Sequence, residues 1–259
     1  MTAESPSGAP GTATYVYGVV RASEAPKIDA AGFGRDARVR NLTEGELTAI
    51  VSDVDAGFVE AGREDLERHM AVLEQAALSA TVVPLRFGTV MPDDDAVTAE
   101  LLRGRAAEIE ERLAALDGRV ELTLSGTYEE RIFGEVVAEQ PEVAALRERV
   151  RGRDENATYY DRIRLGELVA EAMAAKRQRD TEQVLAKLRP LADDVRVGDV
   201  SHERSVLKAS FLVHRDRLPE FDRAAEEVAA QNRTRIRFNY AGPLPPYDFV
   251  GGEKPGPWG

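Results

Sequence analysis

Two stretches of the chain carry its most informative patterns: VVPLRFGTV at residues 82–90 and RIRFNYAGPLPPYDFV at residues 235–250. In the first, the apolar and β-branched residues predict a strand over residues 82–87, which Gly88 ends. In the second, residues 234–240 have a similar character and predict a closing strand. Each strand runs directly into residues that favour turns, so both stretches mark the end of a sheet element.

The last 18 residues of the chain hold five prolines and five glycines, which excludes a regular helix or a central strand. The same segment carries Tyr247, Phe249 and Trp258, although a disordered tail usually lacks such aromatic residues. We therefore expect residues 243–250 to pack in an extended form against the folded body. The cleft between two domains is a candidate place for this packing.

The sequence on either side of the first stretch predicts a ferredoxin-like α+β domain over residues 14–130, with two helices on one side of a sheet. Apolar residues repeat every three or four positions in the helices, and every second position in the last strand. The predicted elements are a strand at 14–21 (TYVYGVVR), a hairpin at 39–42 and 47–54, a helix at 64–78, the strand at 82–87, a helix from 93–95 to about 116, and a strand at 119–128.

The remainder of the chain predicts a second, smaller α+β domain that is joined to the first through helices. We expect a helical region over residues 131–192 and a sheet portion over residues 193–242. The two ends are expected to be a flexible tail at residues 1–13 and the Pro/Gly-rich tail at residues 243–259. The predicted fold is thus α+β with two domains and an extended C-terminal tail.

Composition excludes several functional classes. The chain has no cysteine, so disulfides, thiolate metal sites and thiol catalysis are absent. Its net charge of −12 argues against nucleic acid as a partner, and no apolar stretch is long enough to span a membrane. The basic run AAKRQRD at residues 174–180 is short, and we expect it to be a solvated helix face. With no secretory signal, we expect a cytoplasmic protein.

No residue pattern predicts a catalytic, metal or cofactor site, so we expect that the chain is not an enzyme and has no cofactor. The histidines at positions 69, 202 and 214 form no metal-ligand motif, and we expect His69 to pair with Asp65 at the surface of a helix. The acidic run Asp93–Asp95 is expected to cap a helix and not to bind a metal. Arg86 is expected either to face solvent or to be buried and paired with a carboxylate.

Four segments together resemble the gas vesicle GvpF/GvpL family: TYVYGVV at residues 14–20, VVPLRFGTV, RIRLGELVAEA at residues 162–172, and RIRFNYAGPLPPYDFV. The resemblance covers nearly the whole chain after residue 14, in the same order and spacing. One departure is Leu244, where many relatives carry tryptophan. The residues that carry the motifs, and that we expect to be structural, are Pro84, Leu85, Arg86, Phe87, Gly88, Gly166, Glu167, Gly242, Pro245, Pro246, Tyr247 and Phe249.

The resemblance implies an accessory protein in gas vesicle assembly, located in the cytoplasm and at the gas vesicle. Its implied partners are the gas vesicle shell subunit and other gas vesicle accessory proteins. The partner-binding residues are unknown, and the sequence leaves open whether the chain is an F-type or an L-type member. The alternative is a ligand-binding or catalytic tandem ferredoxin-like protein, which a deep pocket containing Arg86 and a histidine or a carboxylate pair would favour.

Overall fold

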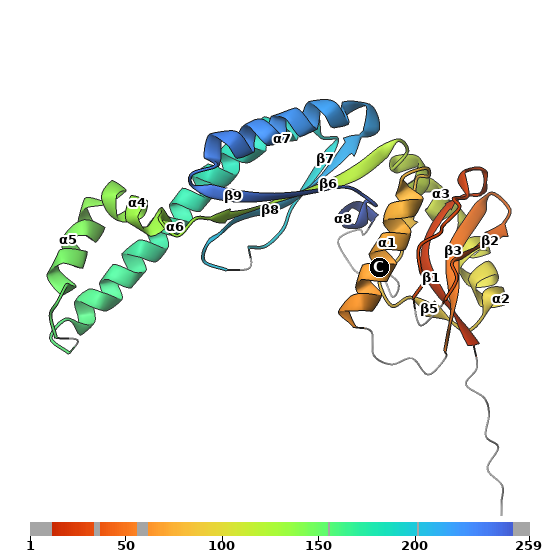
Figure 1. Cartoon of the computed structure of the whole chain (residues 1–259), viewed down its shortest axis with the longest axis horizontal. Coiled ribbons are helices and arrows are strands. Elements are labelled where there is room, and N and C mark those ends of the chain that lie inside the picture. Colours follow the sequence, from red (N-terminus) through yellow and green to blue (C-terminus); the bar gives the residue numbers. More distant parts are fainter. Residues whose placement is uncertain (1–11, 34–36, 56–61, 155, 201, 251–259) are drawn as a thin grey trace, which may run out of the picture. The chain divides into compact units, whose positions relative to one another are not determined.

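The computed structural model describes most of the chain, namely residues 12–33, 37–55, 62–154, 156–200 and 202–250. Two compact units make up the fold (Figure 1). Unit 1 comprises residues 1–121 and 242–259, and unit 2 comprises residues 122–241. Most of the tail expected at residues 1–13 lies outside the described residues, as does Trp258, whereas Thr12 and Ala13 already belong to the first strand.

Unit 1 is built on an antiparallel sheet in the order β2-β3-β1-β4, with β5 also paired to β1. Helix α1 lies on one face of the sheet, and α2 and α3 lie on the other (Figure 1). The elements are β1 (Thr12–Arg21), η1 (Ala22–Glu24), β2 (Arg40–Glu44), β3 (Leu47–Asp55), α1 (Arg63–Ala77), β4 (Val83–Pro84), β5 (Val90–Met91), α2 (Asp94–Ala96), η2 (Val97–Arg103) and α3 (Ala106–Ala115).

Strand β1 is the central strand of this sheet and is buried along both faces from Ala13 to Val20. Its TYVYGVV sequence supplies β-branched and aromatic side chains for the two faces. Gly18 has to be small, because a Cβ atom there would lie 2.9 Å from the carbonyl oxygen of Val83 and 3.0 Å from a methyl carbon of Val82. The strand register shifts between Val16 and Gly18, at this point of close approach.

The strand predicted at residues 82–87 is much shorter in the structure, where β4 covers only Val83 and Pro84. Leu85 still donates its N–H to the Tyr17 carbonyl at 2.8 Å, but the chain then turns. The Thr89 N–H closes the turn on the Arg86 carbonyl at 3.1 Å, and Gly88 adopts a φ of +86°. The apolar run at residues 82–87 therefore forms a short strand and the start of a turn, because its last residues leave the sheet.

Unit 2 has a second sheet, in the order β7-β8-β6-β9. Its element order is strand, helices, strand, strand, helix, strand, which is the order of the ferredoxin-like pattern. The elements are β6 (Arg119–Tyr128), α4 (Ile132–Glu139), α5 (Pro141–Val150), α6 (Tyr159–Leu188), η3 (Arg189–Leu191), β7 (Asp194–Val197), β8 (Ser205–His214), η4 (Arg215–Arg217), α7 (Leu218–Asn232) and β9 (Ile236–Leu244).

The placement of β6 corrects the sequence-based fold. Residues 119–128 were expected to complete the first sheet, but β6 lies between β8 and β9 in the second sheet. In the first sheet, by contrast, the described residues between β1 and β2 form no α-helix, so the element order differs from the ferredoxin-like one. Alternating apolar residues identify a half-buried strand correctly, but they do not identify its partner strands.

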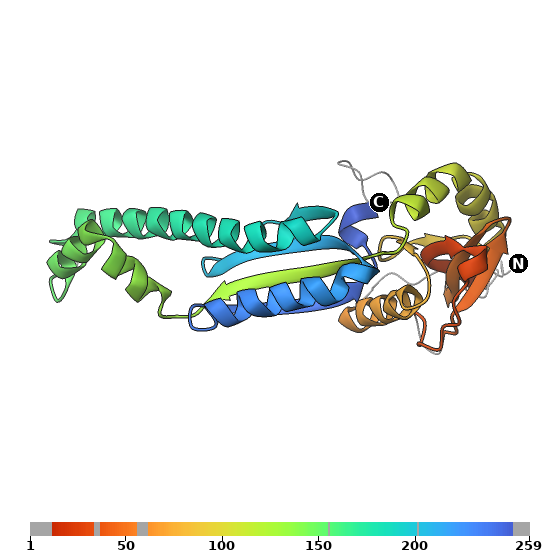
Figure 2. The ribbon, with the colours of Figure 1, turned by 90° about the horizontal axis from the view of Figure 1, so that it is seen from above.

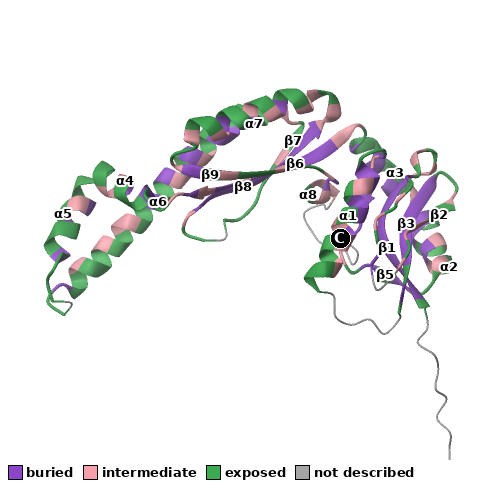
Figure 3. Cartoon of the chain, viewed as in Figure 1, coloured by how far each residue is buried: buried purple, intermediate pink, exposed green. Residues whose placement is uncertain are grey.

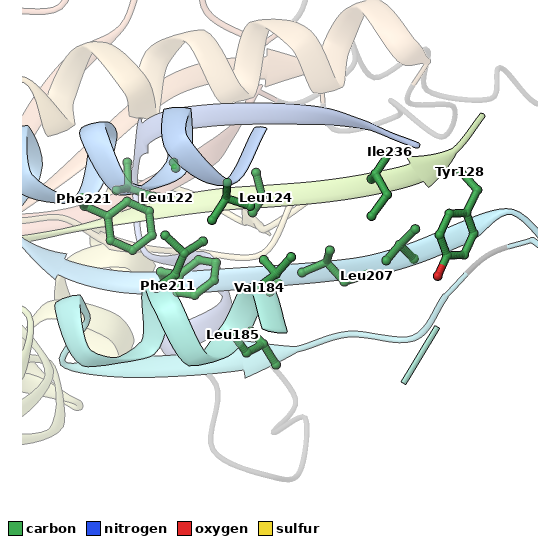
Figure 4. Packing of buried hydrophobic residues seen from close by; sticks show 14 of the residues in the cluster. Leu122, Leu124, Tyr128, Val184, Leu185, Leu207, Phe211, Phe221 and Ile236 are labelled. Carbon is green, nitrogen blue, oxygen red and sulfur yellow. The ribbon is translucent and has the colours of Figure 1, made fainter. Parts of the chain in front are cut away.

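Helices α6 and α7 lie side by side on one face of the second sheet (Figure 2). They enclose a core in which the rings of Phe211 and Phe221 are 5.1 Å apart and meet edge to face. Val184 and Leu185 of α6 face the same layer, together with Leu122 of β6 (Figure 4).

The end of the described chain returns to unit 1. Strand β9 continues to Leu244, and α8 (Tyr247–Val250) forms one helical turn that contacts β4. Pro245 and Pro246 are buried, and the backbone N–H of Asp248 donates to the Glu121 carboxylate at 3.0 Å. The extended form expected for residues 243–250 is therefore wrong for α8.

Candidate functional site

The two stretches that dominate the sequence meet at a buried histidine. His69 of α1 is fully buried, and it contacts Phe87 from the turn after β4 and Tyr247 from α8. We call the surrounding group of rings the His69 cluster. Its members are Tyr15, Tyr17, Phe33, His69, Phe87 and Tyr247.

Both ring nitrogens of His69 are hydrogen-bonded. Nδ1 lies 2.9 Å from the hydroxyl of Tyr15, and Nε2 is bonded to the hydroxyl of Tyr247. The Tyr15 oxygen also accepts the backbone N–H of Gly88 at 3.1 Å. A neutral imidazole has one N–H donor and one acceptor nitrogen, so one of the two tyrosine hydroxyls donates to the ring and the other accepts from it.

The remaining rings hold this arrangement in place. The hydroxyl of Tyr17 lies 2.9 Å from Ser52 Oγ and accepts the backbone N–H of Phe33 at 2.5 Å. Phe33 stacks on Tyr15 with ring centres 4.2 Å apart, and Phe87 meets the imidazole edge to face at 5.4 Å. The polar atoms of these side chains are therefore used inside the cluster, as buried polar groups require.

Burial sets the electrostatics of the cluster. It lowers the pKa of His69 to about 4, and it raises the pKa of Tyr15 and Tyr247 above the ordinary tyrosine range. At neutral pH all three groups are uncharged. A neutral, enclosed imidazole whose two nitrogens are both bonded to protein groups is suited to fixing α8 on α1, and is not poised to exchange protons with a substrate.

The surface ion pair expected between His69 and Asp65 is wrong. Asp65 instead accepts the backbone N–H of Gly62 at 3.0 Å, at the start of α1. Helical spacing of four residues places the two side chains on related faces. The spacing alone does not indicate which side of the helix faces the sheet. His69 is on that buried side, where a neutral imidazole is more favourable than a charged one.

The other motif residues lie in different surroundings. Arg86 is exposed, and its side chain has no hydrogen bond or ion pair with another described residue, so the solvent-facing alternative is confirmed. Gly166 and Glu167 belong to α6 in unit 2 and are exposed. Glu167 pairs with Arg164 at 3.3 Å, as the helical spacing predicts. A Cβ atom on Gly166 would contact nothing within 4 Å, so the space around it does not require glycine.

The acidic run Asp93–Asp95 caps a helix, as expected. Asp93 accepts the N–H of Ala96 at 2.8 Å. Asp94 has a further role that the sequence did not indicate, because Arg40 donates to both of its oxygens at 2.8 Å and thereby lowers its pKa. Among the described residues, no group of three or more histidine, aspartate or glutamate side chains could hold a metal ion.

A second buried polar group, the Asp180 network, joins α4 and α6 to the sheet of unit 2. Asp180 accepts hydrogen bonds from the Tyr128 hydroxyl at 2.6 Å and from Arg235 Nη2 at 2.9 Å. Burial, and then the hydrogen bond to this carboxylate, raise the pKa of Tyr128. Lys176 donates to a carboxylate of α4 at 2.8 Å. The full network is Tyr128, Glu135, Glu139, Lys176, Asp180 and Arg235.

The Asp180 network corrects the interpretation of residues 174–180 as a solvated helix face. Lys176 and Asp180 are each only 6% exposed. The sequence showed a run of charges on a helix, and such runs are usually solvated. The side chains that bind Lys176 and Asp180 come from β6, α4 and the residue that precedes β9, all distant in the sequence. The local pattern of residues 174–180 therefore could not predict that these two charges are buried.

Two hollows add to the candidate surfaces. One, in unit 1, lies beside the first motif and has about 30 Å³ of space, lined by Leu85, Thr89, Met91, Glu100, Leu101 and Arg105. The other is an open groove of about 350 Å³ in unit 2, between α6 and β7, with Val197, Val200, Val206 and Leu207 along it.

In the described ranges, no helix is both long and apolar enough to cross a bilayer.

Comparison with known proteins gives a consistent result over nearly the whole chain. Residues 13–251 match the family described as gas vesicle synthesis protein GvpL/GvpF. Gas vesicle protein F from Streptomyces sp. (strain CB03234) is 38% identical over 92% of this chain and 99% of its own. Gas vesicle protein F from Nostoc sp. (strain PCC 7120) is 24% identical over 91% of this chain and 97% of its own.

Solved structures agree at the level of the fold. The crystal structure of GvpF from Anabaena sp. PCC7120 superposes with a TM-score of 0.78 at 23% identity, covering 94% of this chain and all of that chain. GvpF from Microcystis aeruginosa gives a TM-score of 0.73 at 22% identity, covering 92% and 99%. The family match and the Streptomyces relative together show that the chain belongs to the gas vesicle synthesis protein GvpL/GvpF family.

Proposed function

We propose that this chain is a non-catalytic accessory protein of gas vesicle assembly, which binds the gas vesicle shell subunit or other accessory proteins in the cytoplasm and at the vesicle. The observation that carries the proposal is the family match over residues 13–251. The motif residues of the His69 cluster then serve the fold of unit 1, and partners bind elsewhere on the surface.

The chemistry of the described residues supports a binding role over the catalytic alternative. The one fully buried histidine is neutral at physiological pH and has protein partners on both nitrogens. Arg86, the arginine that would have marked a ligand pocket, is exposed and does not line the small hollow beside its own motif. That hollow has room for about one water molecule.

We assign contact with an apolar shell segment to the groove beside β7. Val197 and Val200 are 51% and 38% exposed, and Val206 and Leu207 are buried at the groove. Strand β7 is at the end of the β7-β8-β6-β9 order, so one of its sides has no partner strand among the described residues. An exposed strand edge next to apolar side chains is suited to the addition of an extended apolar segment.

The test is a double variant, Val197→Asp with Val200→Asp, produced in a gas-vesicle-forming strain from which the natural gene has been deleted. We expect loss of floating vesicles and loss of co-purification of the tagged shell subunit, because two carboxylates would be desolvated on binding. Leu78→Asp is the matched control, since Leu78 is 72% exposed in unit 1.

The thermal unfolding midpoint of each purified variant separates loss of binding from loss of fold. Normal vesicles and normal co-purification with the double variant would exclude the groove as the contact surface. Normal vesicles in the deletion strain itself would contradict the assembly role as a whole.

A further inference from the structure

Helix α5 and the first half of α6 form an arm that contributes little to the core of unit 2 (Figure 3). None of residues 159–172 is buried, and the first buried residue of α6 is Met173. The arm is held together by apolar residues of α5, of which Val143, Leu146 and Val150 are buried where α5 contacts α6. In the first half of this 30-residue helix, Val169 and Ala172 pack against the core of unit 2, and the residues before them extend beyond it.

The base of the arm is fixed by buried charges. Lys176 of α6 binds Glu139 of α4 at 2.8 Å and lies 3.6 Å from Glu135. One turn further along α6, Asp180 binds Tyr128 and Arg235 from the sheet region. Breaking such contacts leaves buried charge uncompensated, so the network opposes bending of the arm at its base.

The far end of the arm has a positive net charge, opposite in sign to that of the chain as a whole. Residues 147–164 contain six arginines against four acidic residues, a net charge of +2 in a chain whose total is −12. We call this surface the arm tip. Its exposed members are Arg147, Arg149, Arg151, Arg153, Tyr159, Tyr160, Arg162, Ile163 and Arg164.

Only part of this positive charge is balanced within the arm. Arg149 donates to Asp161 at 2.6 Å, which joins the two helices. Arg151 pairs with Glu148 at 3.4 Å, and Arg164 lies 3.3 Å from Glu167 and 3.8 Å from Glu142. The side chains of Arg147 and Arg153 make no hydrogen bond or ion pair with another described residue, although both are exposed. The arm tip therefore presents guanidinium groups that are available to an external carboxylate.

Aromatic and apolar side chains lie among these arginines. Tyr160 is 84% exposed and Tyr159 is 59% exposed, and their rings meet edge to face with centres 5.4 Å apart. Ile163, one turn further along α6, is also exposed. Tyrosine and arginine are the residue types that most often dominate binding energy at protein interfaces.

We propose that the arm tip is a docking surface for an acidic segment of a partner protein, in which carboxylates bind the arginines and an apolar side chain packs on the tyrosine pair. The exposed guanidinium groups of Arg147 and Arg153, which pair with no described carboxylate, are complementary to such a segment. A protein segment is favoured over nucleic acid because the net charge is only +2 and Ile163 offers no contact to phosphate. The residues of this surface are different from those that line the groove beside β7.

The test begins with a photo-crosslinking amino acid at position 160, introduced into the full chain in gas-vesicle-forming cells. The crosslinked segment is identified by mass spectrometry and synthesised, and its affinity for the purified chain is measured. We expect a segment with clustered aspartate or glutamate, whose binding weakens as salt is raised.

A charge-reversal pair, Arg147→Glu with Arg153→Glu, should weaken binding of that peptide by at least about tenfold, since neither side chain has a partner to lose in the described fold. Arg131→Glu with Arg233→Glu is the matched control, because these exposed arginines of unit 2 also lack side-chain partners among the described residues. The control should change affinity by less than about twofold.

Several results would overturn the proposal: no crosslink at position 160, a crosslink to RNA, a crosslink to a second copy of this chain, or a crosslinked segment without acidic residues. Equal affinity for the charge-reversal pair and the wild type would overturn it too. The groove variants at Val197 and Val200 report on the proposed function independently, since they are expected to leave peptide binding at the arm tip unchanged.

Discussion

His69 should make the stability of unit 1 depend on pH below neutrality. Burial lowers the pKa of His69 in the folded chain to about 4, from an ordinary value of 6.5 that applies when the chain is unfolded. Between these values the unfolded chain binds a proton that the folded chain does not, so the free energy of unfolding falls as pH falls. At pH 5 the loss relative to pH 7.5 is about 2 kcal/mol from this group alone.

The measurement is urea unfolding of the wild type and of His69→Gln, followed by circular dichroism from pH 7.5 to pH 5. Glutamine is neutral over this range, so the variant is less stable at pH 7.5 but should lose about 2 kcal/mol less on acidification. Carboxylates with lowered pKa values, such as Asp94 and Glu108, also lose stabilising interactions in acid, but they are common to both proteins.

Proton NMR of the imidazole groups gives a direct check, because the chain has only three histidines. The resonance that disappears in His69→Gln should not shift in wild-type protein until the pH approaches 4. The reasoning is refuted if that resonance titrates near pH 6.5, or if the two proteins lose the same free energy between pH 7.5 and pH 5.

Three further substitutions test the packing, each by thermal and urea unfolding. Gly166→Ala should raise the free energy of unfolding by about 0.5–1 kcal/mol, since the exposed helical site has open space; destabilisation would contradict this. Gly18→Ala should lower it by about 1–3 kcal/mol, because the new methyl group meets the Val83 carbonyl, and an unchanged midpoint would mean that the strands separate easily. Asp180→Asn should lower it by roughly 2 kcal/mol, because Tyr128 and Arg235 lose hydrogen bonds to a charged carboxylate, although Arg235 keeps Glu135; a neutral effect would show that the network is dispensable.

Features that depend on nearby residues were predictable from the sequence. The apolar repeat of residues 64–78 predicted α1 to within one residue at each end. The acidic run at the start of α2 predicted a cap, because an aspartate that directly precedes a helix accepts an N–H from its first turn, as Asp93 does. The pairing of Arg164 with Glu167 followed from helical spacing in the same way.

Features that depend on distant partners were not predictable. His69 and Tyr247 are 178 residues apart in the chain, and no local pattern indicates that they bond. The partner strands of β6 were assigned to the wrong sheet for the same reason. The signal that could have identified the site is compositional: aromatic residues recur in TYVYGVV, in the first motif and in the C-terminal segment, and buried aromatic residues tend to pack together.

Unit 1 contains residues from both sides of unit 2 in the sequence, so unit 2 is an insertion with two covalent connections to its host. During synthesis at about 5–20 residues per second, Tyr247 follows His69 by roughly 10 to 35 s. Throughout that interval the Nε2 side of the imidazole is without its hydroxyl partner, and the inserted unit has time to form its own core. The hydrogen bond between His69 and Tyr247 can therefore form only after the whole of unit 2 has been synthesised. In a chain that ends before α8, the side of α1 that carries His69 lacks Tyr247 and is accessible to chaperones or proteases.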